Sequence, residues 1–156
     1  MKLFYAVMIG AMGLAGVPGA VEGNNVPYPK ENVAEFVVAK LDVTTLPSAV
    51  RPKRENGKKT FAEYGYVTRQ IADKEALIER AAEDSEINIR ILEQRSSGLY
   101  VCIGGESKNA GRSRMQGVFL LTMKSATGLL RGRESFVEFE GCPVIGGADA
   151  DADSSY

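Results

Sequence analysis

The chain has 156 residues, of which 44% are hydrophobic and 25% are charged, a composition ordinary for one globular domain. Its 19 basic and 20 acidic residues leave a formal net charge of −1, so no overall charge draws it to nucleic acid or to an anionic membrane. It contains no histidine, which excludes Ser-His-Asp and Cys-His catalysis.

The N-terminal segment has the order of a secretory signal peptide over residues 1–20. Lys2 supplies a positive start, residues 3–15 form an uncharged apolar run, and small residues follow. The run is shorter than the roughly 20 residues that cross a bilayer, although a retained membrane anchor is the alternative. We expect cleavage after Gly19 or Ala20, a periplasmic or secreted protein, and no membrane span in the mature chain.

One domain is expected over residues 31–145. Residues 21–30 contain glycine, asparagine and proline and predict a flexible lead-in. Residues 146–156 contain little that a core would bury, and they predict a disordered acidic tail.

Short helices are predicted at the start of this domain. An apolar stripe at three-to-four spacing indicates a helix that begins near Glu31. The stripe consists of Val33, Phe36, Val37 and Leu41. A helical turn over 46–50 follows, and then a short helix over 60–65 with Thr60 as its cap and Gly65 at its end.

Strands dominate the second half of the chain. Ile87, Ile89 and Ile91 recur with a period of two, which is typical of a strand. The predicted strands are 86–92, 99–103, 115–123 and 129–139, with turns at 96–98 and 124–128 and a polar loop at 104–114. Residues 67–82 fit either a helix or a strand near 74–80, and the strand is favoured because a sheet follows.

These elements predict an α+β fold in which short N-terminal helices precede an antiparallel β-meander of four to five strands, forming a partly open, barrel-like sheet. Cys102 and Cys142 are the only cysteines. An even cysteine count in an exported chain predicts one disulfide, with two buried thiols as the alternative. No zinc-type ligand spacing and no phosphate-binding glycine motif is present, so neither a metal nor a cofactor is expected.

Two basic groups are candidate binding sites. The first is a candidate anion-binding patch made of Arg112, Arg114, Arg131 and Arg133. Surface ion pairing, with Glu134, Glu138 and Glu140 as partners, is its alternative. The second is a candidate partner-docking loop at 51–59 that contains Arg51, Lys53, Arg54, Lys58 and Lys59. It would bind an acidic protein or an envelope phosphate, and a merely solvated loop is its alternative.

Carboxylates on the last predicted strand offer the only catalytic chemistry considered. Glu138 and Glu140 lie two positions apart, and Glu134 would share their face. Two carboxylates about 5–10 Å apart hydrolyse glycosidic bonds in many enzymes. The alternative is a charged strand edge that keeps other chains from pairing.

Several stretches resemble a group of small exported bacterial proteins without an assigned activity. They are LDVTTLPSAVRPKR (41–54), KKTFAEYG (58–65), LYVC (99–102) and LLRGRESFVEFEGCPVIG (129–146). This resemblance covers most of the mature chain and implies no site residues. Tyr100, Cys102, Cys142 and the 125–128 turn also resemble, in outline, the inhibitors of c-type lysozyme, which implies a protein-binding role. The chain departs from that family in having no tryptophan and an additional helical N-terminal part.

The sequence therefore predicts a non-catalytic exported binding module whose partner, for example a protein, lies in the cell envelope or the medium. An inhibitor of a cell-wall-degrading enzyme and a carboxylate-based glycan hydrolase are the alternatives.

Overall fold

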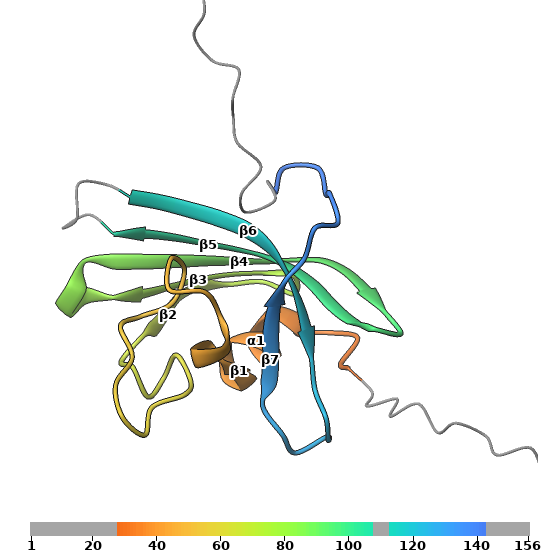
Figure 1. Ribbon diagram of the computed structural model, residues 1–156, viewed down its shortest axis with the longest axis horizontal. Helices are drawn as coiled ribbons and strands as arrows, with labels where there is room; N and C mark the ends of the chain where they lie inside the picture. The colour runs from red at the N-terminus through yellow and green to blue at the C-terminus, as the bar shows by residue number, and fades with distance from the viewer. Residues whose placement is uncertain (1–27, 108–112, 143–156) are drawn as a thin grey trace, which may run out of the picture.

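The computed structural model describes residues 28–107 and 113–142. The predicted signal peptide, most of the predicted lead-in and the predicted tail lie outside these residues. The described chain is mostly β-structure, with a sheet that curves around one α-helix as a half-barrel (Figure 1). Within these residues no helix is long and apolar enough to cross a membrane.

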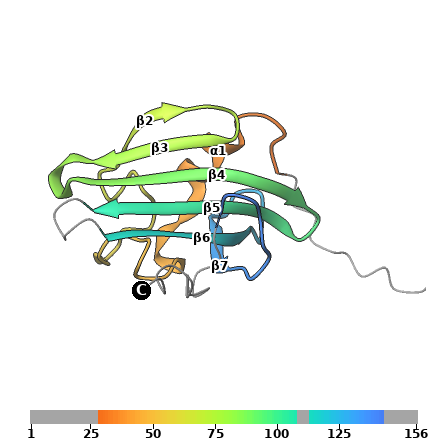
Figure 2. The ribbon, with the colours of Figure 1, turned by 90° about the horizontal axis from the view of Figure 1, so that it is seen from above.

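Seven strands form one mixed sheet in the order β1-β7-β6-β5-β4-β3-β2, and Figure 2 shows the part of this order from β7 to β2. Their bounds are β1 (Leu41–Asp42), β2 (Val67–Ile71), β3 (Glu75–Arg80), β4 (Ser85–Arg95), β5 (Gly98–Ser107), β6 (Ser113–Thr122) and β7 (Leu130–Glu134). All neighbours pair antiparallel except β1 and β7, which are parallel. The helical elements are α1 (Val33–Lys40) and the 3-10 helices η1 (Val43–Thr45) and η2 (Ala81–Glu83).

The predicted helix near Glu31 is confirmed as α1. Val33 and Val37 are buried on its sheet-facing side, and Phe36 packs partly buried against the same core. The helix ends where Leu41 turns extended and pairs with Leu130 of β7. Helix and first strand are therefore one continuous segment that closes the concave side of the sheet.

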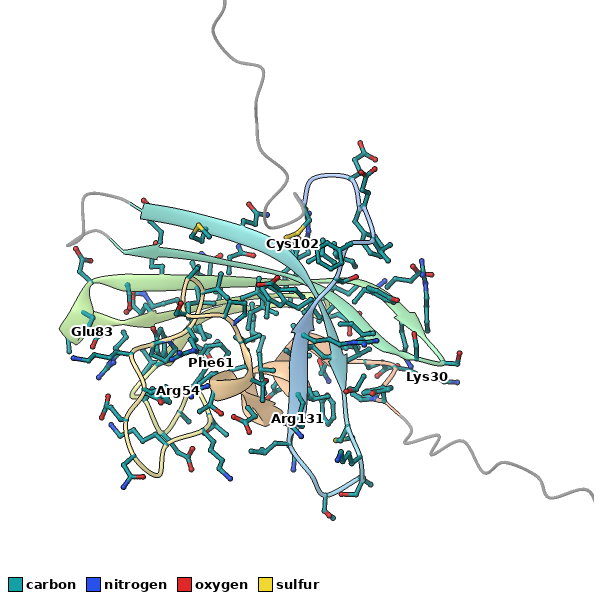
Figure 3. All side chains as sticks on the ribbon, in the orientation of Figure 1. Lys30, Arg54, Phe61, Glu83, Cys102 and Arg131 are labelled. Carbon is teal, nitrogen blue, oxygen red and sulfur yellow. A yellow bond between two sulfur atoms is a disulfide. The ribbon has the colours of Figure 1, made fainter. Side chains whose placement is uncertain are left out.

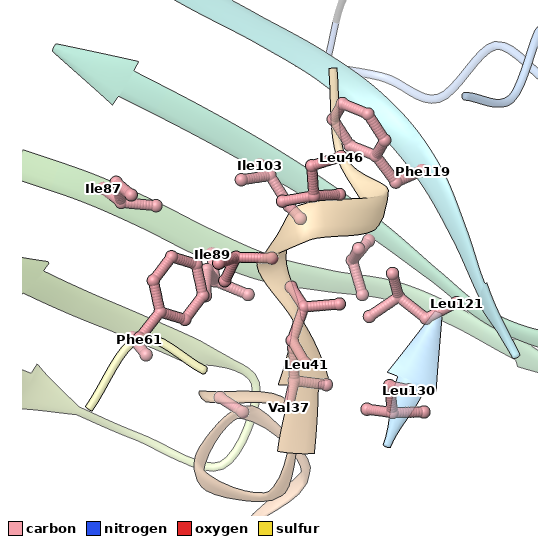
Figure 4. Close-up of a cluster of buried hydrophobic side chains, with 14 of the residues drawn as sticks. Val37, Leu41, Leu46, Phe61, Ile87, Ile89, Ile103, Phe119, Leu121 and Leu130 are labelled. Carbon is pink, nitrogen blue, oxygen red and sulfur yellow. The ribbon is translucent and has the colours of Figure 1, made fainter. Parts of the chain in front are cut away.

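The main hydrophobic core lies between this segment and the concave, inner face of the sheet (Figure 4). Ile89, Ile103 and Phe119 contribute from β4, β5 and β6 and are fully buried. Phe61 and Tyr64 enter the core from the 46–66 segment, which runs beneath the sheet. A buried aliphatic or aromatic side chain of this kind contributes about 1.5–3 kcal/mol to stability.

The predicted fold of short N-terminal helices followed by an antiparallel meander of four to five strands is wrong. The sheet has seven strands and is mixed, and α1 is the only α-helix of the described residues. The predicted short helix over 60–65 is a hydrogen-bonded turn, in which the Tyr64 amide bonds the Thr60 carbonyl at 3.2 Å. The short turn predicted over 46–50 is present, closed by a bond from the Val50 amide to the Pro47 carbonyl at 3.2 Å.

Two physical reasons explain the difference, and the bounds of three strands differ as well. Every residue of β2 is exposed, so no alternation of apolar and polar residues marks this edge strand. The two-residue β1 follows α1 without a break and gains its strand character only by pairing with β7. Finally, β5 and β6 extend into the predicted 104–114 loop, whereas β7 ends at Glu134 instead of continuing to residue 139.

Residues 135–142, which we call the strap, cross the outer, convex face of the sheet after β7 (Figure 1). They form no strand apart from an isolated bridge between Phe139 and Cys142. Under the strap lies a second apolar cluster that contains Tyr100, Val118 and Leu120, with Val137 and Phe139 packed against it. The sheet is thus covered by the helix and the 46–66 segment on one face and, in part, by the strap on the other.

Candidate functional site

A groove of about 330 Å³ lies on the outer face of the sheet, beside the end of the strap. Its walls come from β3, β4, β5 and β6 and include both charged and apolar side chains. The lining residues are Glu75, Leu77, Glu86, Asn88, Arg90, Cys102, Gly104, Gly105, Glu106, Met115 and Gln116. We call this the outer groove.

Strand register explains why a hollow forms at this place. Leu77, Asn88, Gly104 and Gln116 face one another in successive strands and form one row across the sheet. Residues paired in register share a face of the sheet. Since Gly104 has no side chain, the row has a gap between Asn88 and Gln116, and this gap forms the floor of the outer groove.

Polar groups flank the floor on both sides. Glu75 faces Arg90 in the next row, and Glu86 faces Glu106 in the row on the other side. The side chains of Glu75 and Asn88 are exposed and form no hydrogen bond or ion pair with any residue that the structure describes. Glu86 and Glu106, by contrast, are engaged in interactions with other residues. The groove therefore offers an amide and a carboxylate with unused hydrogen-bonding capacity.

The predicted disulfide between Cys102 and Cys142 is confirmed and forms one end of the groove (Figure 3). The two Cα atoms are 5.9 Å apart, within the usual range for a disulfide. The bond joins the middle of β5 to the end of the strap. Both cysteines are buried, so the bond lies beneath the strap on the sheet surface.

Hydrogen bonds hold the strap beside the disulfide. Arg90 donates from Nη2 to the Gly141 carbonyl at 2.7 Å, and Gln116 Nε2 approaches the same carbonyl at 3.5 Å while it donates to the Cys102 Sγ of β5 at 3.0 Å. Farther along the outer face, the Arg95 guanidinium stacks on the ring of Tyr100 at 4.7 Å. Arg95 also pairs with Glu93, and this contact raises the pKa of Arg95 and lowers the pKa of Glu93.

The candidate docking loop lies on the inner side of the sheet, below the edge formed by β2 and β3 (Figure 3). Three of its cations are occupied by local contacts. Arg54 donates to the Thr44 carbonyl at 2.9 Å, Arg51 donates to the Pro52 carbonyl at 3.3 Å, and Lys58 pairs with Glu55. Lys53 and Lys59 are exposed, and neither side chain forms an ion pair within the described residues.

Two carboxylates organise this loop. The hydrogen bond from Lys58 lowers the pKa of Glu55, which also pairs with Arg80 at 3.4 Å. Glu63 accepts from the backbone amides of Thr60 and Lys59, each at 2.7 Å, and these bonds lower the pKa of Glu63. The loop is therefore fixed largely by its own acids, which reduces the charge that it presents to a partner.

A smaller hollow of about 230 Å³ lies between the loop and the ends of β4 and β5. Arg51, Tyr66 and Glu83 are among the residues that line it. Burial raises the pKa of Tyr66, whose hydroxyl lies 3.3 Å from the Ser85 hydroxyl. Tyr66 is therefore a neutral hydrogen-bonding side chain at the edge of the hydrophobic core.

The register separates members of the candidate anion-binding patch. Arg133 faces Leu120 of β6, whereas Arg114 faces Glu106 at the other end of β6. At about 3.4 Å per residue, positions 114 and 120 are roughly 20 Å apart along that strand. Arg131 and Arg133 are exposed and form no ion pair with a described residue, and Arg112 lies outside the described residues.

The carboxylates considered for glycan hydrolysis do not share a strand. Glu134 is the last residue of β7, whereas Glu138 and Glu140 belong to the strap. All three are exposed. The 125–128 turn, which carried part of the likeness to lysozyme inhibitors, joins β6 to β7 and is closed by a bond from the Gly128 amide to the Ser125 carbonyl at 3.0 Å.

The outer groove was missed at the sequence level. Polar residues alternate with Ile87, Ile89 and Ile91 and indicate the outer face of the sheet. Two of these polar residues, Asn88 and Arg90, line the outer groove. The glycines at 104 and 105 suggest a polar loop by their composition, although they continue β5. The polar neighbours of Gly104 lie on other strands, so only the register of the assembled sheet locates the groove.

The described residues contain no group of three or more acidic or cysteine side chains arranged to hold a metal ion. Comparisons with protein-family models, curated proteins and solved structures found no match to this chain.

Proposed function

We propose that this protein is a non-catalytic binding module of the cell envelope or the extracellular medium, and that its ligand occupies the outer groove. The observation that carries the proposal is the groove itself. Its volume of about 330 Å³ falls within the range of small-ligand sites, which is about 300–1,000 Å³. Its floor is open because Gly104 stands in the row between Asn88 and Gln116.

Two features support an exported protein. Disulfides persist in oxidising compartments, and Cys102 and Cys142 are bonded. The first 20 residues also have the composition of a signal peptide. Both point to the periplasm or the medium as the place where the groove meets its ligand.

The lining of the groove favours binding over catalysis. Its one cysteine is oxidised, and its guanidinium, that of Arg90, already donates to the Gly141 carbonyl. Asn88 and Gln116 contribute amides, which hydrogen-bond well and are poor acids and bases. These two amides recognise a ligand without transferring protons to it, and Glu75 is the one lining carboxylate without a partner among the described residues.

Amide chemical shifts of the purified protein test the proposal. We expect at least one of four small probes, N-acetylglucosamine, triglycine, arginine and inorganic phosphate, to shift the resonances of Asn88 and Gln116. Gly104→Leu should abolish these shifts, because its side chain fills the floor. A Cβ at Gly104 meets Gln116 Cγ and the Met115 carbonyl oxygen at 3.5 Å, an ordinary contact, and the circular dichroism spectrum of the variant should match that of the parent.

The matched control is Ala126→Leu, which adds an apolar side chain on the exposed turn between β6 and β7. This variant should respond to the probes as the parent protein does. Shifts at other surfaces only, or equal responses from the parent protein and Gly104→Leu, would rule out the outer groove as the binding site.

A further inference from the structure

The shape of the outer groove selects an elongated ligand. Its floor runs across the sheet from Leu77 on β3 to Gln116 on β6, through Asn88 and Gly104. Neighbouring strands are about 4.8 Å apart, so the three steps between these strands span about 14 Å. A chain of several small units fits this path better than one compact molecule.

The hydrogen-bonding groups along this path act as both donors and acceptors. The Asn88 amide has no partner among the described residues, and Gln116 uses only Nε2, which leaves its Oε1 for a ligand. The Glu75 carboxylate adds an acceptor. A hydroxyl group both donates and accepts, so a chain rich in hydroxyl groups satisfies all three side chains.

The charge of the lining disfavours an anionic ligand. Glu75 is exposed and has no partner among the described residues, and Arg90, the one cation that the described lining residues include, already donates to the Gly141 carbonyl. An anionic ligand would therefore meet an unpaired carboxylate and no uncommitted cation at this floor. The ligand is therefore expected to be neutral.

The position of the groove disfavours an extended peptide. Peptides that add to a sheet do so along an edge strand, where backbone groups are unpaired. The groove floor instead lies across β3 to β6, of which β3, β4 and β5 are paired on both sides there, and only the Met115–Gln116 part of β6 is unpaired on the side of β7. A peptide placed across them would find too few partners for its own amides and carbonyls.

We infer that the outer groove binds a neutral oligosaccharide of several sugar units, and this inference rests on the proposed function. No aromatic side chain is among the lining residues, so hydrogen bonds must supply the affinity. Binding should therefore be weak and should depend strongly on single polar side chains.

The test titrates the purified protein with three chains of different chemistry, followed by amide chemical shifts. Chitotetraose is neutral, tetraglycine is a peptide, and tetragalacturonate is anionic. We expect chitotetraose to shift Asn88, Gly104 and Gln116, and the other two to leave them unchanged. Asn88→Ala should weaken chitotetraose binding by about tenfold, whereas Asn56→Ala, in the exposed 51–59 loop, should leave it unchanged.

The remaining outcomes separate this inference from the proposed function. If tetraglycine or tetragalacturonate shifts the resonances of the groove residues and chitotetraose does not, the inference of an oligosaccharide ligand is overturned. The proposal that the groove binds a ligand is then retained. If Asn88→Ala and Asn56→Ala bind chitotetraose equally, the Asn88 side chain does not bind the sugar, and its assigned role in recognition is overturned. If none of the three chains and none of the four small probes shifts the groove, both the inference and the proposed function are overturned.

Discussion

Arg90 on β4 donates a hydrogen bond to the backbone carbonyl of Gly141, a residue 51 positions later in the chain, over 2.7 Å. The Gln116 amide approaches the same carbonyl at 3.5 Å, and the neighbouring Cys142 is bonded to Cys102. The end of the strap is thus held by a guanidinium, an amide and a disulfide. Because Arg90, Gln116 and Cys102 also line the outer groove, the position of the strap and the shape of the groove depend on each other.

Replacing Arg90 by methionine tests this link. Arg90→Met keeps an unbranched apolar stem and removes the donors, so the strap should detach more readily. We expect the free energy of unfolding to fall by about 1 kcal/mol, because the lost hydrogen bond is charge-assisted but exposed. Urea denaturation measures this loss, and hydrogen exchange of the strap should become faster.

Arg69→Met is the control for that variant. Arg69 lies on the edge strand β2 and forms an exposed ion pair with Glu79 at 2.9 Å. Such a pair is worth about 0–1 kcal/mol, and its loss should not alter exchange in the strap. Unchanged strap exchange in Arg90→Met would show that the Arg90 hydrogen bond does not hold this segment.

The disulfide is expected to be the strongest single constraint on the strap. It closes a loop with a sequence separation of 40, for which the chain-entropy treatment gives about 4 kcal/mol. The double variant Cys102→Ala/Cys142→Ala should lose about 2–4 kcal/mol in urea denaturation. It should also bind a hydrophobic dye, because Tyr100 and Leu120 become uncovered.

The parent protein reduced with dithiothreitol is the comparison for the double variant. The reduced parent and the double variant should have the same midpoint of urea denaturation and the same dye binding, because each lacks only the covalent link. A double variant that unfolds at the urea concentration of the oxidised parent would mean that the packing of Val137 and Phe139 holds the strap without the disulfide.

Local patterns predicted the elements that carry an apolar periodicity. The stripe of α1 and the alternation around Ile89 arise because one side of each element is buried, and one-sided burial produces a periodic pattern of apolar residues in the sequence. The edge strand β2 has no buried residue and therefore shows no such periodic pattern. The pairing of β1 with β7 joins Leu41 to Leu130 and depends on how distant segments meet, which no local pattern contains.

The candidate site was predictable only in part. The disulfide followed from the cysteine count, because only one pairing exists for Cys102 and Cys142. The outer groove depends on the register that sets Gly104 between Asn88 and Gln116, and register is a property of the assembled sheet. The 104–114 segment also suggested a loop because of its glycines, which obscured the strand that forms the groove floor.

Glu63 should make stability depend on pH in the acidic range. Backbone hydrogen bonds lower its pKa in the folded protein below the value of about 4.3 expected for an unfolded chain. A lowered folded pKa means that the charged form stabilises the fold above the unfolded pKa, and that this contribution disappears as pH falls through the folded pKa. Glu63→Gln should therefore lower the melting temperature most near pH 7, and the difference from the parent should shrink toward pH 3.

Glu138→Gln is the control for the pH series. Glu138 is exposed in the strap and forms no hydrogen bond with a described residue, so its loss should not produce the same trend. A difference between Glu63→Gln and the parent that stays constant from pH 7 to pH 3 would contradict the role assigned to the Glu63 carboxylate.

Gly98 should be the glycine least tolerant of substitution. It opens β5 with φ at +140°, and a Cβ built there would clash with the Leu121 carbonyl oxygen of β6. A side chain would therefore impose an unfavourable backbone conformation and push β6 away from β5. Gly98→Ala should lower the free energy of unfolding by about 1–3 kcal/mol from backbone strain, with a further loss from the displaced strand.

Gly105→Ala is the matched substitution in the same strand. A Cβ at Gly105 has no atom within 4 Å, so the variant should be neutral or gain about 0.5–1 kcal/mol, as alanine replaces glycine inside a strand. Urea denaturation of both variants compares the two positions under identical conditions. Equal stability of Gly98→Ala and Gly105→Ala would show that β5 and β6 separate locally to admit a side chain at position 98, and the close approach of these strands would then not be a constraint on the sheet.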